Sequence, residues 1–238
     1  MSEDLLDYHG ISGYLRLGLL KVRSVVAIYG LLKAATVFAP KVLSLQLLYR
    51  MEGELSDVAK SSAPHQGLTF EGISTLERFL KWNHQSDLED LRGLYGIVQA
   101  KLRLSRGYVL SCAYSGESLA GFLWLAPHDS SEAGYRTEVS EGYCIDGFTF
   151  PEHRGKGALP NLFKFLAITI AATNPSVDRI VAHCGVSNRA SVAGQKKAGL
   201  KIAALELSLM ALSFHRKLRM KTYPSELIQR PPRHVADE

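Results

Sequence analysis

The chain has 238 residues, of which 46% are hydrophobic and 21% are charged, and its formal net charge is +5. This composition excludes a disordered or collagen-like chain and predicts one main globular domain plus an extension. The positive charge suits an anionic ligand, an acidic membrane surface or nucleic acid equally well. The three cysteines, Cys112, Cys144 and Cys184, form no CxxC pair. This spacing argues against a disulfide framework or a zinc cluster and favours a reducing cytoplasm.

Residues 1–60 are predicted to form a basic, apolar N-terminal extension with helical structure. From Tyr8 to Met51 the only charged side chains are Lys and Arg. The longest charge-free run, Ser24 to Leu32, is shorter than the ~18 apolar residues that a spanning helix needs. Asp4 and Asp7 also fit a secretory signal poorly. Two interpretations stay open: residues 1–50 lie on the inner face of an anionic membrane, or they pack on the main domain.

The main domain is predicted over residues 61–222, with a loose tail at 223–238. Its first strand begins at Leu68 and is followed by two helices, over 73–82 and 86–104. The elements expected next, in chain order, are a hairpin over 107–114 and 119–127, a strand over 143–150, a helix over 161–172, a strand over 178–185, a helix over 188–199, and one or two strands over 200–220. This order predicts a mixed α/β (α+β) sheet.

The stretch Phe150–Pro160, FPEHRGKGALP, joins an apolar strand to a helix. A Walker A loop would need Gly at position 150 and Ser or Thr at position 157, which are Phe and Gly here. A dinucleotide fingerprint that starts at Gly155 would need Gly at position 160, which is Pro. The remaining interpretation is a helix N-terminus with unpaired N–H groups that attract an anion, where glycine lets phosphates reach the backbone.

Two motifs in the right order resemble the GNAT acyltransferase superfamily. PEHRGKG at 151–157 resembles that family's P-x-x-R-G-x-G loop. VSNRASVAGQKKAGL at 186–200 resembles its second motif, an Asn followed by a short helix that ends in Lys-x-Gly. The resemblance covers about residues 68–220. It implies a GNAT-like acyl-CoA acyltransferase fold, acetyl-CoA as co-substrate, no metal, and direct attack of a primary amine on the thioester.

The resemblance also implies a set of site residues. Backbone amides near Thr149 and Phe150 are expected to hold the pantetheine and the developing oxyanion. The residues expected at the cofactor are Thr149, Phe150, Arg154, Gly155, Lys156, Gly157, Ala158 and Asn188. The amine must lose a proton, and Asp146, a carboxylate inside an apolar strand, is the first candidate base, with Glu141 and Tyr143 in reserve. Pairing of Asp146 with a nearby Arg or Lys is an equally open interpretation.

Two positions depart from the family's pattern. Leu159 stands where the family has Gly or Ala, and Gln195 stands where it often has a Tyr that protonates the leaving thiolate. Ordinary thiol pKa values of about 8.5 make thiolate a tolerable leaving group without that donor. The alternative is a catalytically degenerate GNAT domain that binds acyl-CoA as a sensor or scaffold. A nucleic-acid-binding module is disfavoured because Lys and Arg are dispersed.

Two further patterns resemble nucleophile sites. GESLA at 116–120 lies in a hairpin turn and does not lead into a helix, which argues against Ser118 as a nucleophile. Cys184 is next to His183, but neighbours in a strand point to opposite faces, so a buried Cys184 is the favoured interpretation. The acceptor stays open: an amino sugar, a polyamine, an amino acid or a protein amine would all supply the amine.

Overall fold

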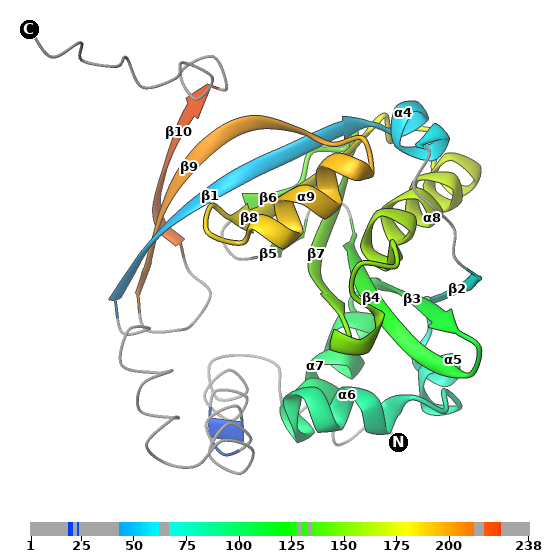
Figure 1. Cartoon of the computed structure of the whole chain (residues 1–238). Helices are drawn as coiled ribbons and strands as arrows, with labels where there is room; N and C mark the ends of the chain where they lie inside the picture. Colours follow the sequence, from blue (N-terminus) through cyan, green and yellow to red (C-terminus); the bar gives the residue numbers. More distant parts are fainter. Residues whose placement is uncertain are drawn as a thin grey trace, which may run out of the picture.

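The structure is a computed structural model that describes residues 19–20, 23, 43–61, 67–127, 130–132, 135–211 and 217–224. Within these ranges, one mixed sheet of eight strands organises the fold (Figure 1). In their order across the sheet, the strands are β10 (Lys217–Pro224), β9 (Lys201–Ala211), β1 (Leu43–Glu54), β8 (Arg179–Gly185), β7 (Glu141–Thr149), β4 (Ser118–Ala126), β3 (Val109–Ser115) and β2 (Leu68–Ile73). Among the strands of the described residues, only β7 and β8 are paired in parallel. The mixed α/β sheet predicted from the sequence is confirmed.

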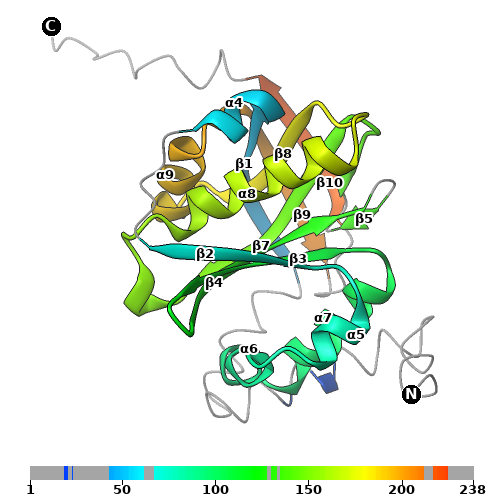
Figure 2. The ribbon, with the colours of Figure 1, turned by 90° about the vertical axis from the view of Figure 1, so that its right-hand side faces the viewer.

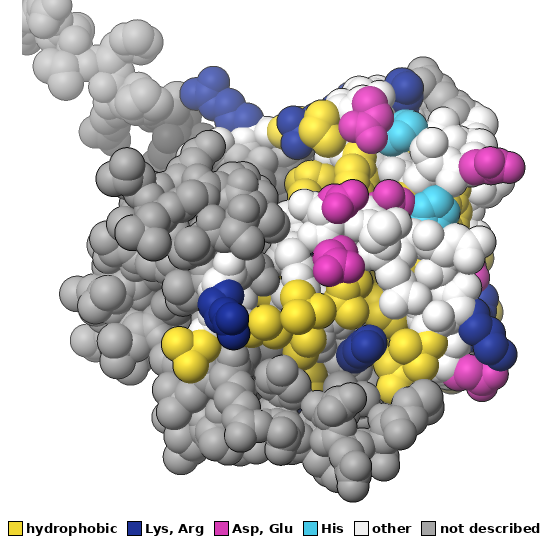
Figure 3. Space-filling view, turned by 90° about the horizontal axis from the view of Figure 1, so that it is seen from below, with side chains coloured by type: hydrophobic (Ala, Val, Ile, Leu, Met, Phe, Trp, Pro, Cys, Tyr) yellow, Lys and Arg dark blue, Asp and Glu magenta, His cyan; other side chains and the backbone are white. Residues whose placement is uncertain are grey.

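Helices cover both faces of the sheet (Figure 2). One face carries α4 (Leu55–Lys60), α8 (Ala158–Thr173) and α9 (Arg189–Lys197), and the other carries α5 (Leu76–Leu80), α6 (Gln85–Arg92) and α7 (Leu94–Ser105). A 3-10 turn, η2 (Pro151–His153), precedes α8, and the short strands β5 (Ser131–Glu132) and β6 (Tyr135–Arg136) pair apart from the main sheet. The exposed side of α6 carries acidic residues, including Glu89 and Asp90. Figure 3 shows acidic and hydrophobic side chains together on this side of the molecule.

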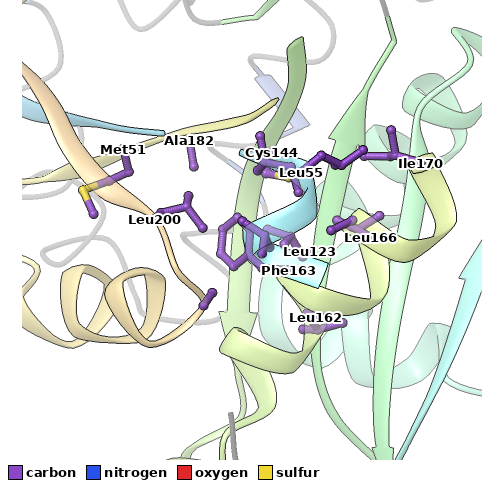
Figure 4. Close-up of a cluster of buried hydrophobic side chains, with 14 of the residues drawn as sticks. Met51, Leu55, Leu123, Cys144, Leu162, Phe163, Leu166, Ile170, Ala182 and Leu200 are labelled. Atoms are coloured by element: carbon purple, nitrogen blue, oxygen red, sulfur yellow. The ribbon is translucent and has the colours of Figure 1, made fainter. Parts of the chain in front are cut away.

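Each face of the sheet has its own hydrophobic core. The core under α8 contains the inward face of that helix, with Leu162, Phe163, Leu166 and Ile170 all at most 4% exposed (Figure 4). The i, i+3, i+4 spacing of apolar residues in the sequence predicted this face correctly. The core under α5 to α7 is rich in aromatic side chains, among them Phe79, Phe122 and Trp124. The sheet is therefore fixed from both sides.

The predicted domain boundary at residue 61 is wrong for residues 43–60. Residues 43–54 form β1, which is hydrogen-bonded to β8 on one side and to β9 on the other. They are strand and not helix because the apolar residues of LSLQLLYRMEGE begin by alternating, so that the strand buries side chains such as Met51 in the core under α8. The sheet domain therefore begins at β1. Leu19, Leu20 and Arg23 are helical, and the remaining predictions for residues 1–42 lie outside the described residues.

The helical region between β2 and β3 contains three helices and not two. Gly93 adopts φ +65° and ψ −171°, which ends α6 and begins α7. A side chain would disfavour this backbone conformation, so the glycine splits what the apolar periodicity predicts as one helix. The tail at 225–238 lies outside the described residues. Within the described part of the chain, no helix combines the length and the apolar composition that crossing a membrane requires.

Candidate active site

The loop between β7 and α8 has the backbone conformation that its glycines predict. Gly155 and Gly157 adopt φ +78° and +82°, and Gly157 is the N-cap of α8. Asn161 donates its backbone N–H to the carbonyl of Gly157, so the amides before it precede the helix's own hydrogen-bond ladder. A Cβ built on Gly155 would meet no atom within 4 Å. The loop therefore presents a bare, exposed backbone next to the positive end of a 16-residue helix.

The other loop residues frame this backbone. Arg154 and Lys156 are exposed, and Arg154 Nε lies 3.4 Å from the carbonyl oxygen of Thr149. Ala158 is buried at the start of α8, as the motif predicts for the first helical residue. Both basic side chains are therefore placed beside the loop without filling it.

The parallel strands β7 and β8 separate next to this loop. Their pairs end at Cys144 with Ala182, although both strands continue beyond that point. A cleft of about 220 Å³ opens there, lined by both strands and by residues of α8 and α9. Its lining includes Gly147, Leu159, Cys184, Asn188, Ser191 and Gln195. The two sequence motifs therefore meet at one cleft, one supplying the loop before α8 and the other supplying α9.

Two glycines accommodate Leu159, the first departure from the family's pattern. A Cβ on Gly194 would lie 2.9 Å from Leu159 Cδ2, and a Cβ on Gly147 would lie 3.3 Å from Leu159 Cδ1. Both distances are shorter than ordinary carbon contacts. The leucine therefore fits between α9 and β7 only because these two positions lack side chains, and α8 begins where the motif predicts.

Gln195 is a buried polar residue that lines the cleft from α9. It is 4% exposed, and its Nε2 donates to Ser191 Oγ at 3.0 Å. Its Oε1 accepts no hydrogen bond from the described residues. A buried amide oxygen without a donor is costly, so its position on the cleft wall indicates a ligand donor there. Asn188 also lines the cleft, but its Oδ1 caps α9 by accepting from Ser191 N at 3.1 Å.

Asp146 is held by two arginines and is poorly suited to be a base. Arg92 binds both of its carboxylate oxygens at 2.6 and 2.7 Å, and Arg103 Nη1 lies 2.6 Å from Oδ2. Burial alone would raise the pKa of Asp146, but Arg103 and Arg92 outweigh it and hold the pKa well below the ordinary range. The prediction of Asp146 as base loses its support, because such a carboxylate has little tendency to take a proton. The alternative interpretation, an Asp paired with Arg, is the one observed.

Asp146 also marks a bulge in β7. Its φ is +56°, and the pairing of β7 with β4 shifts register between Phe122 and Trp124. A bulge leaves an extra residue unpaired and bends the strand. The bulge lies just beyond Cys144, the last β7 residue paired with β8, where the cleft opens.

Glu141, the first reserve base, lies at the start of β7, away from the cleft. It accepts from Arg50 Nη2 at 2.8 Å, from Tyr135 Oη at 2.5 Å and from the amide of Glu138 at 3.1 Å. With these partners, the 1% exposed carboxylate is an internal ion pair. It is not positioned to meet a substrate.

Tyr143, the second reserve base, contacts His183, which the sequence analysis weighed only as a partner of Cys184, and His183 in turn contacts Glu206, which sequence reasoning missed. Its hydroxyl lies 3.1 Å from His183 Nδ1, and His183 Nε2 lies 2.8 Å from Glu206 Oε2. Cys184 belongs to the core under α8, whereas His183 packs against Tyr143 and Tyr135 on the other face. The prediction that strand alternation separates Cys184 from His183 is confirmed. The signal for Glu206 was a single acidic residue among apolar ones in β9.

Of the two backbone amides expected to hold the oxyanion, those of Thr149 and Phe150, at least one already forms a hydrogen bond within the protein. Phe150 donates its N–H to the carbonyl of Ala120 at 3.0 Å, and Thr149 pairs with Gly121 at the end of β7. The Phe150 amide is therefore part of the sheet and is not available to a ligand, which corrects its predicted role. The β7 residues that line the cleft are Cys144 to Gly147.

Cys184 has the properties of a core thiol. Burial raises its pKa to about 11, although hydrogen bonds from Gln195 and Ser191 partly oppose the rise. Such a thiol is a poor nucleophile at neutral pH. Ser118 is the first residue of β4 and not part of the turn, and the turn leads into a strand and not into a helix, as predicted. No group of three or more His, Cys, Asp or Glu side chains in the described ranges is arranged to hold a metal ion.

Of three comparisons with known proteins, only the comparison with solved structures finds similar proteins. No family model matches the chain, and no curated protein sequence matches it. One similar structure is a tandem GNAT protein from the clavulanic acid biosynthesis pathway, with 16% identity, a TM-score of 0.47, and coverage of 72% of this chain and 55% of that one. Another is a GCN5-related N-acetyltransferase from Kribbella flavida, with 12% identity, a TM-score of 0.42, and coverage of 72% and 60%.

A third similar structure is a GCN5-related N-acetyltransferase from Anabaena variabilis, with 11% identity, a TM-score of 0.41, and coverage of 84% of this chain and 50% of that one. The chain thus spans between half and three fifths of the length of these three proteins. At these identities and TM-scores the likeness establishes neither membership of a family nor an activity.

Proposed function

We propose that the protein is an acyl-CoA-dependent N-acyltransferase that moves an acetyl group from acetyl-CoA to a primary amine by direct attack. The observation that carries the proposal is the position of the loop. Gly155 and Gly157, both with positive φ, lead into α8 at the edge of the cleft between β7 and β8. An anionic pyrophosphate suits such a helix N-terminus.

The volume of the cleft supports a binding mode in which only part of acetyl-CoA enters it. At about 220 Å³ it is smaller than the roughly 300–1,000 Å³ of pockets that enclose a whole drug-sized ligand. The acyl group and part of the pantetheine arm would enter the cleft, while the nucleotide would stay outside on the loop. Gln195 Oε1 would accept a hydrogen bond from the arm, and amides of the bulge at Asp146 and Gly147 would stabilise the oxyanion.

The chemistry does not require an acid among the residues on the cleft wall. The amine nitrogen forms a bond to the thioester carbon, and the C–S bond breaks with its electron pair on the CoA sulfur. Thiolate is a tolerable leaving group near neutral pH, so an amide side chain such as Gln195 need only hydrogen-bond the arm.

A second candidate function is an acyl-CoA sensor without turnover. The observation that favours it is the same Gln195, because an amide cannot donate a proton to a leaving group as a phenol can. The two candidates differ in one measurement, the release of free CoA with primary amines present. The acceptor panel would be spermidine, glucosamine, lysine and a lysine-containing peptide.

The test of the proposal compares two glycines with the same backbone requirement. Gly155 and Gly116 have φ +78° and +61°, and a Cβ on either would meet no atom within 4 Å. Alanine at either position therefore strains the backbone similarly, but only Gly155 lies in the proposed pyrophosphate site. We expect Gly155→Ala to weaken acetyl-CoA binding by ~10-fold or more, about 1.4 kcal/mol, in calorimetry.

The Gly116→Ala control should bind acetyl-CoA as the wild type does, and Lys156→Ala should lose less affinity than Gly155→Ala because its charge is screened. Circular dichroism checks that each variant is folded. The proposal fails if the wild type binds no acetyl-CoA at millimolar ligand. It also fails if both glycine variants lose affinity equally, since the loop would then be only a tight turn.

A further inference from the structure

Three strands bring a phenol, an imidazole and a carboxylate into contact on the face of the sheet opposite α8 and α9. Tyr143 extends from β7, His183 from β8 and Glu206 from β9. The Tyr143 hydroxyl is 3.1 Å from His183 Nδ1, and Glu206 Oε2 is 2.8 Å from His183 Nε2. We call these three residues the buried relay.

The buried relay lies beside the point where the cleft opens. Cys144 and Ala182 form the last pair of β7 with β8, and Tyr143 and His183 flank that pair along the two strands. His183 also contributes to the lining of the cleft. The relay therefore meets the cleft through His183, near the place where a thioester carbonyl would be attacked.

All three side chains of the buried relay are nearly inaccessible to solvent. Glu206 is 1% exposed, Tyr143 is 3% exposed, and the His183 side chain is 7% exposed. A carboxylate at such depth is expensive without hydrogen bonds or an opposite charge. His183 Nε2 lies 2.8 Å from Glu206 Oε2 but outside hydrogen-bond geometry, so the imidazole acts on the carboxylate through its positive charge when it is protonated. The pair is therefore suited to accept a proton and to stabilise the charge that results.

The other polar side chains near His183 interact mainly with carboxylates other than Glu206. Arg50 is opposite His183 in the pairing of β1 with β8, but its guanidinium binds Glu141 at 2.8 Å and Glu52 at 2.5 Å. Tyr135 stacks edge-on at 4.9 Å from the His183 ring and donates its hydroxyl to Glu141. Among the described residues, the titratable and charged groups next to His183 or to its neighbours are Arg50, Tyr135, Glu141, Tyr143 and Glu206.

We propose that the buried relay accepts the proton of the attacking amine; this inference rests on the proposed function. When neutral His183 carries its proton on Nε2, on the side of Glu206, its Nδ1 lone pair is directed to the Tyr143 hydroxyl 3.1 Å away. The amine nitrogen bonds to the thioester carbon and becomes cationic. Its proton passes to Tyr143 Oη while the Tyr143 proton passes to His183 Nδ1, and the C–S bond breaks to leave thiolate. The imidazolium beside Glu206 later returns the proton to the thiolate or to water.

The first test needs no acceptor. Nitrogen-15 NMR of the full chain, with Glu206→Gln for comparison, reads the tautomer of His183. We expect the Nε2–H tautomer in the wild type at neutral pH, with a change in the nitrogen shifts in Glu206→Gln. A wild type with the proton on Nδ1 would overturn the relay, because Nδ1 could then not accept from Tyr143.

The second test is kinetic, with acetyl-CoA and the amine of the acceptor panel that reacts fastest. Tyr143→Phe and Glu206→Gln should each lower kcat at least tenfold while acetyl-CoA affinity changes less than twofold. Tyr135→Phe, which alters another phenol against the same ring, should stay within threefold of the wild type.

The outcomes separate the two proposals. If wild-type protein does not bind acetyl-CoA in calorimetry, the proposed function fails whatever the tautomer. If acetyl-CoA binds and an amine is acetylated, but Tyr143→Phe keeps the wild-type kcat and pH profile, the relay is wrong and the proposed function stands.

Discussion

Arg92 and Asp146 form a bidentate ion pair, with Nη1 and Nη2 of the arginine 2.6 and 2.7 Å from the two carboxylate oxygens. The pair joins α6 to the bulge of β7, and Asp146 is the one non-glycine residue of the described chain with positive φ. A residue in this conformation persists only where its surroundings hold it. The pair therefore stabilises the bulge in β7 beside the opening of the cleft.

Asp146→Asn should destabilise the fold in a pH-dependent way. The pKa of Asp146 lies below its unfolded value of about 3.9, so its stabilisation is complete above pH ~4 and is lost as the pH falls further. We expect a loss of about 1–3 kcal/mol in the free energy of unfolding at pH 7, less than for a fully buried pair, because the side chain is 24% exposed. Urea unfolding at pH 7 and pH 3 measures it.

The difference between wild type and Asp146→Asn should narrow at pH 3. A difference that stays constant between pH 7 and pH 3 would contradict the ion-pair assignment. The variant's turnover should also show no recovery at high pH, which a lost general base would show.

Gly194→Ala should depend on Leu159, because the new Cβ would lie 2.9 Å from Leu159 Cδ2. With Leu159 present, Gly194→Ala should lower the free energy of unfolding by about 1–3 kcal/mol through overpacking, and the higher helix propensity of Ala should offset about 1 kcal/mol of this loss. In a Leu159→Ala background the clash is gone and only the gain remains. We expect the effects of Gly194→Ala in the two backgrounds to differ by about 1 kcal/mol or more in chemical unfolding.

Gly72→Ala is the control for this double-mutant cycle, since its Cβ would meet no atom closer than 3.8 Å and none from Leu159. Its effect should be the same in both backgrounds. Additive effects of Gly194→Ala and Leu159→Ala would show that the contact is not tight.

Gln195→Met should affect the stability of the unliganded fold and the binding of acetyl-CoA in different ways. The substitution keeps a similar volume and removes a buried amide oxygen that accepts no hydrogen bond from the described residues. We therefore expect an unchanged or higher melting temperature without ligand, and a smaller rise on adding acetyl-CoA than in the wild type. A lower melting temperature with an undiminished ligand-induced rise would show that Gln195 serves the fold and not the ligand.

Cys184→Ala should retain turnover, because the thiol has a raised pKa of about 11 and direct attack needs no acyl-enzyme. Intact-mass measurement after mixing wild type with acetyl-CoA should find no acetylated protein. Iodoacetamide should modify the native protein slowly at pH 7.5, since Cys112, Cys144 and Cys184 are all buried. Rapid loss of turnover on alkylation, absent in Cys184→Ala, would instead place the thiol in the reaction.

The sequence predicted the loop well because the loop's conformation is encoded locally. Gly155 and Gly157 can adopt positive φ wherever they stand, and the apolar spacing after Gly157 gives α8 its direction. The same holds for α9, whose N-cap Asn188 is part of the motif. Two local signals thus located both walls of the cleft.

Pairings between distant strands and helices were harder to predict. No local pattern shows that Asp146 meets arginines of α6 and α7, or that β1 lies between β8 and β9. His183 and Glu206 could not be matched for the same reason, since their contact crosses β1. A lone charged residue in an apolar strand is a usable signal, but its partner comes from the sheet order.

The position of β1 affects how the chain can fold. This strand precedes every other strand in the described chain, yet both of its neighbours, β8 and β9, come from the far end of the sequence. During synthesis β1 must remain unpaired until those strands emerge, and pairing across such long loops slows folding. β8, which forms one wall of the cleft, can pair with β1 only after it has emerged at this late stage. We infer that a chain cut before β9 leaves one edge of β1 unpaired and prone to aggregate.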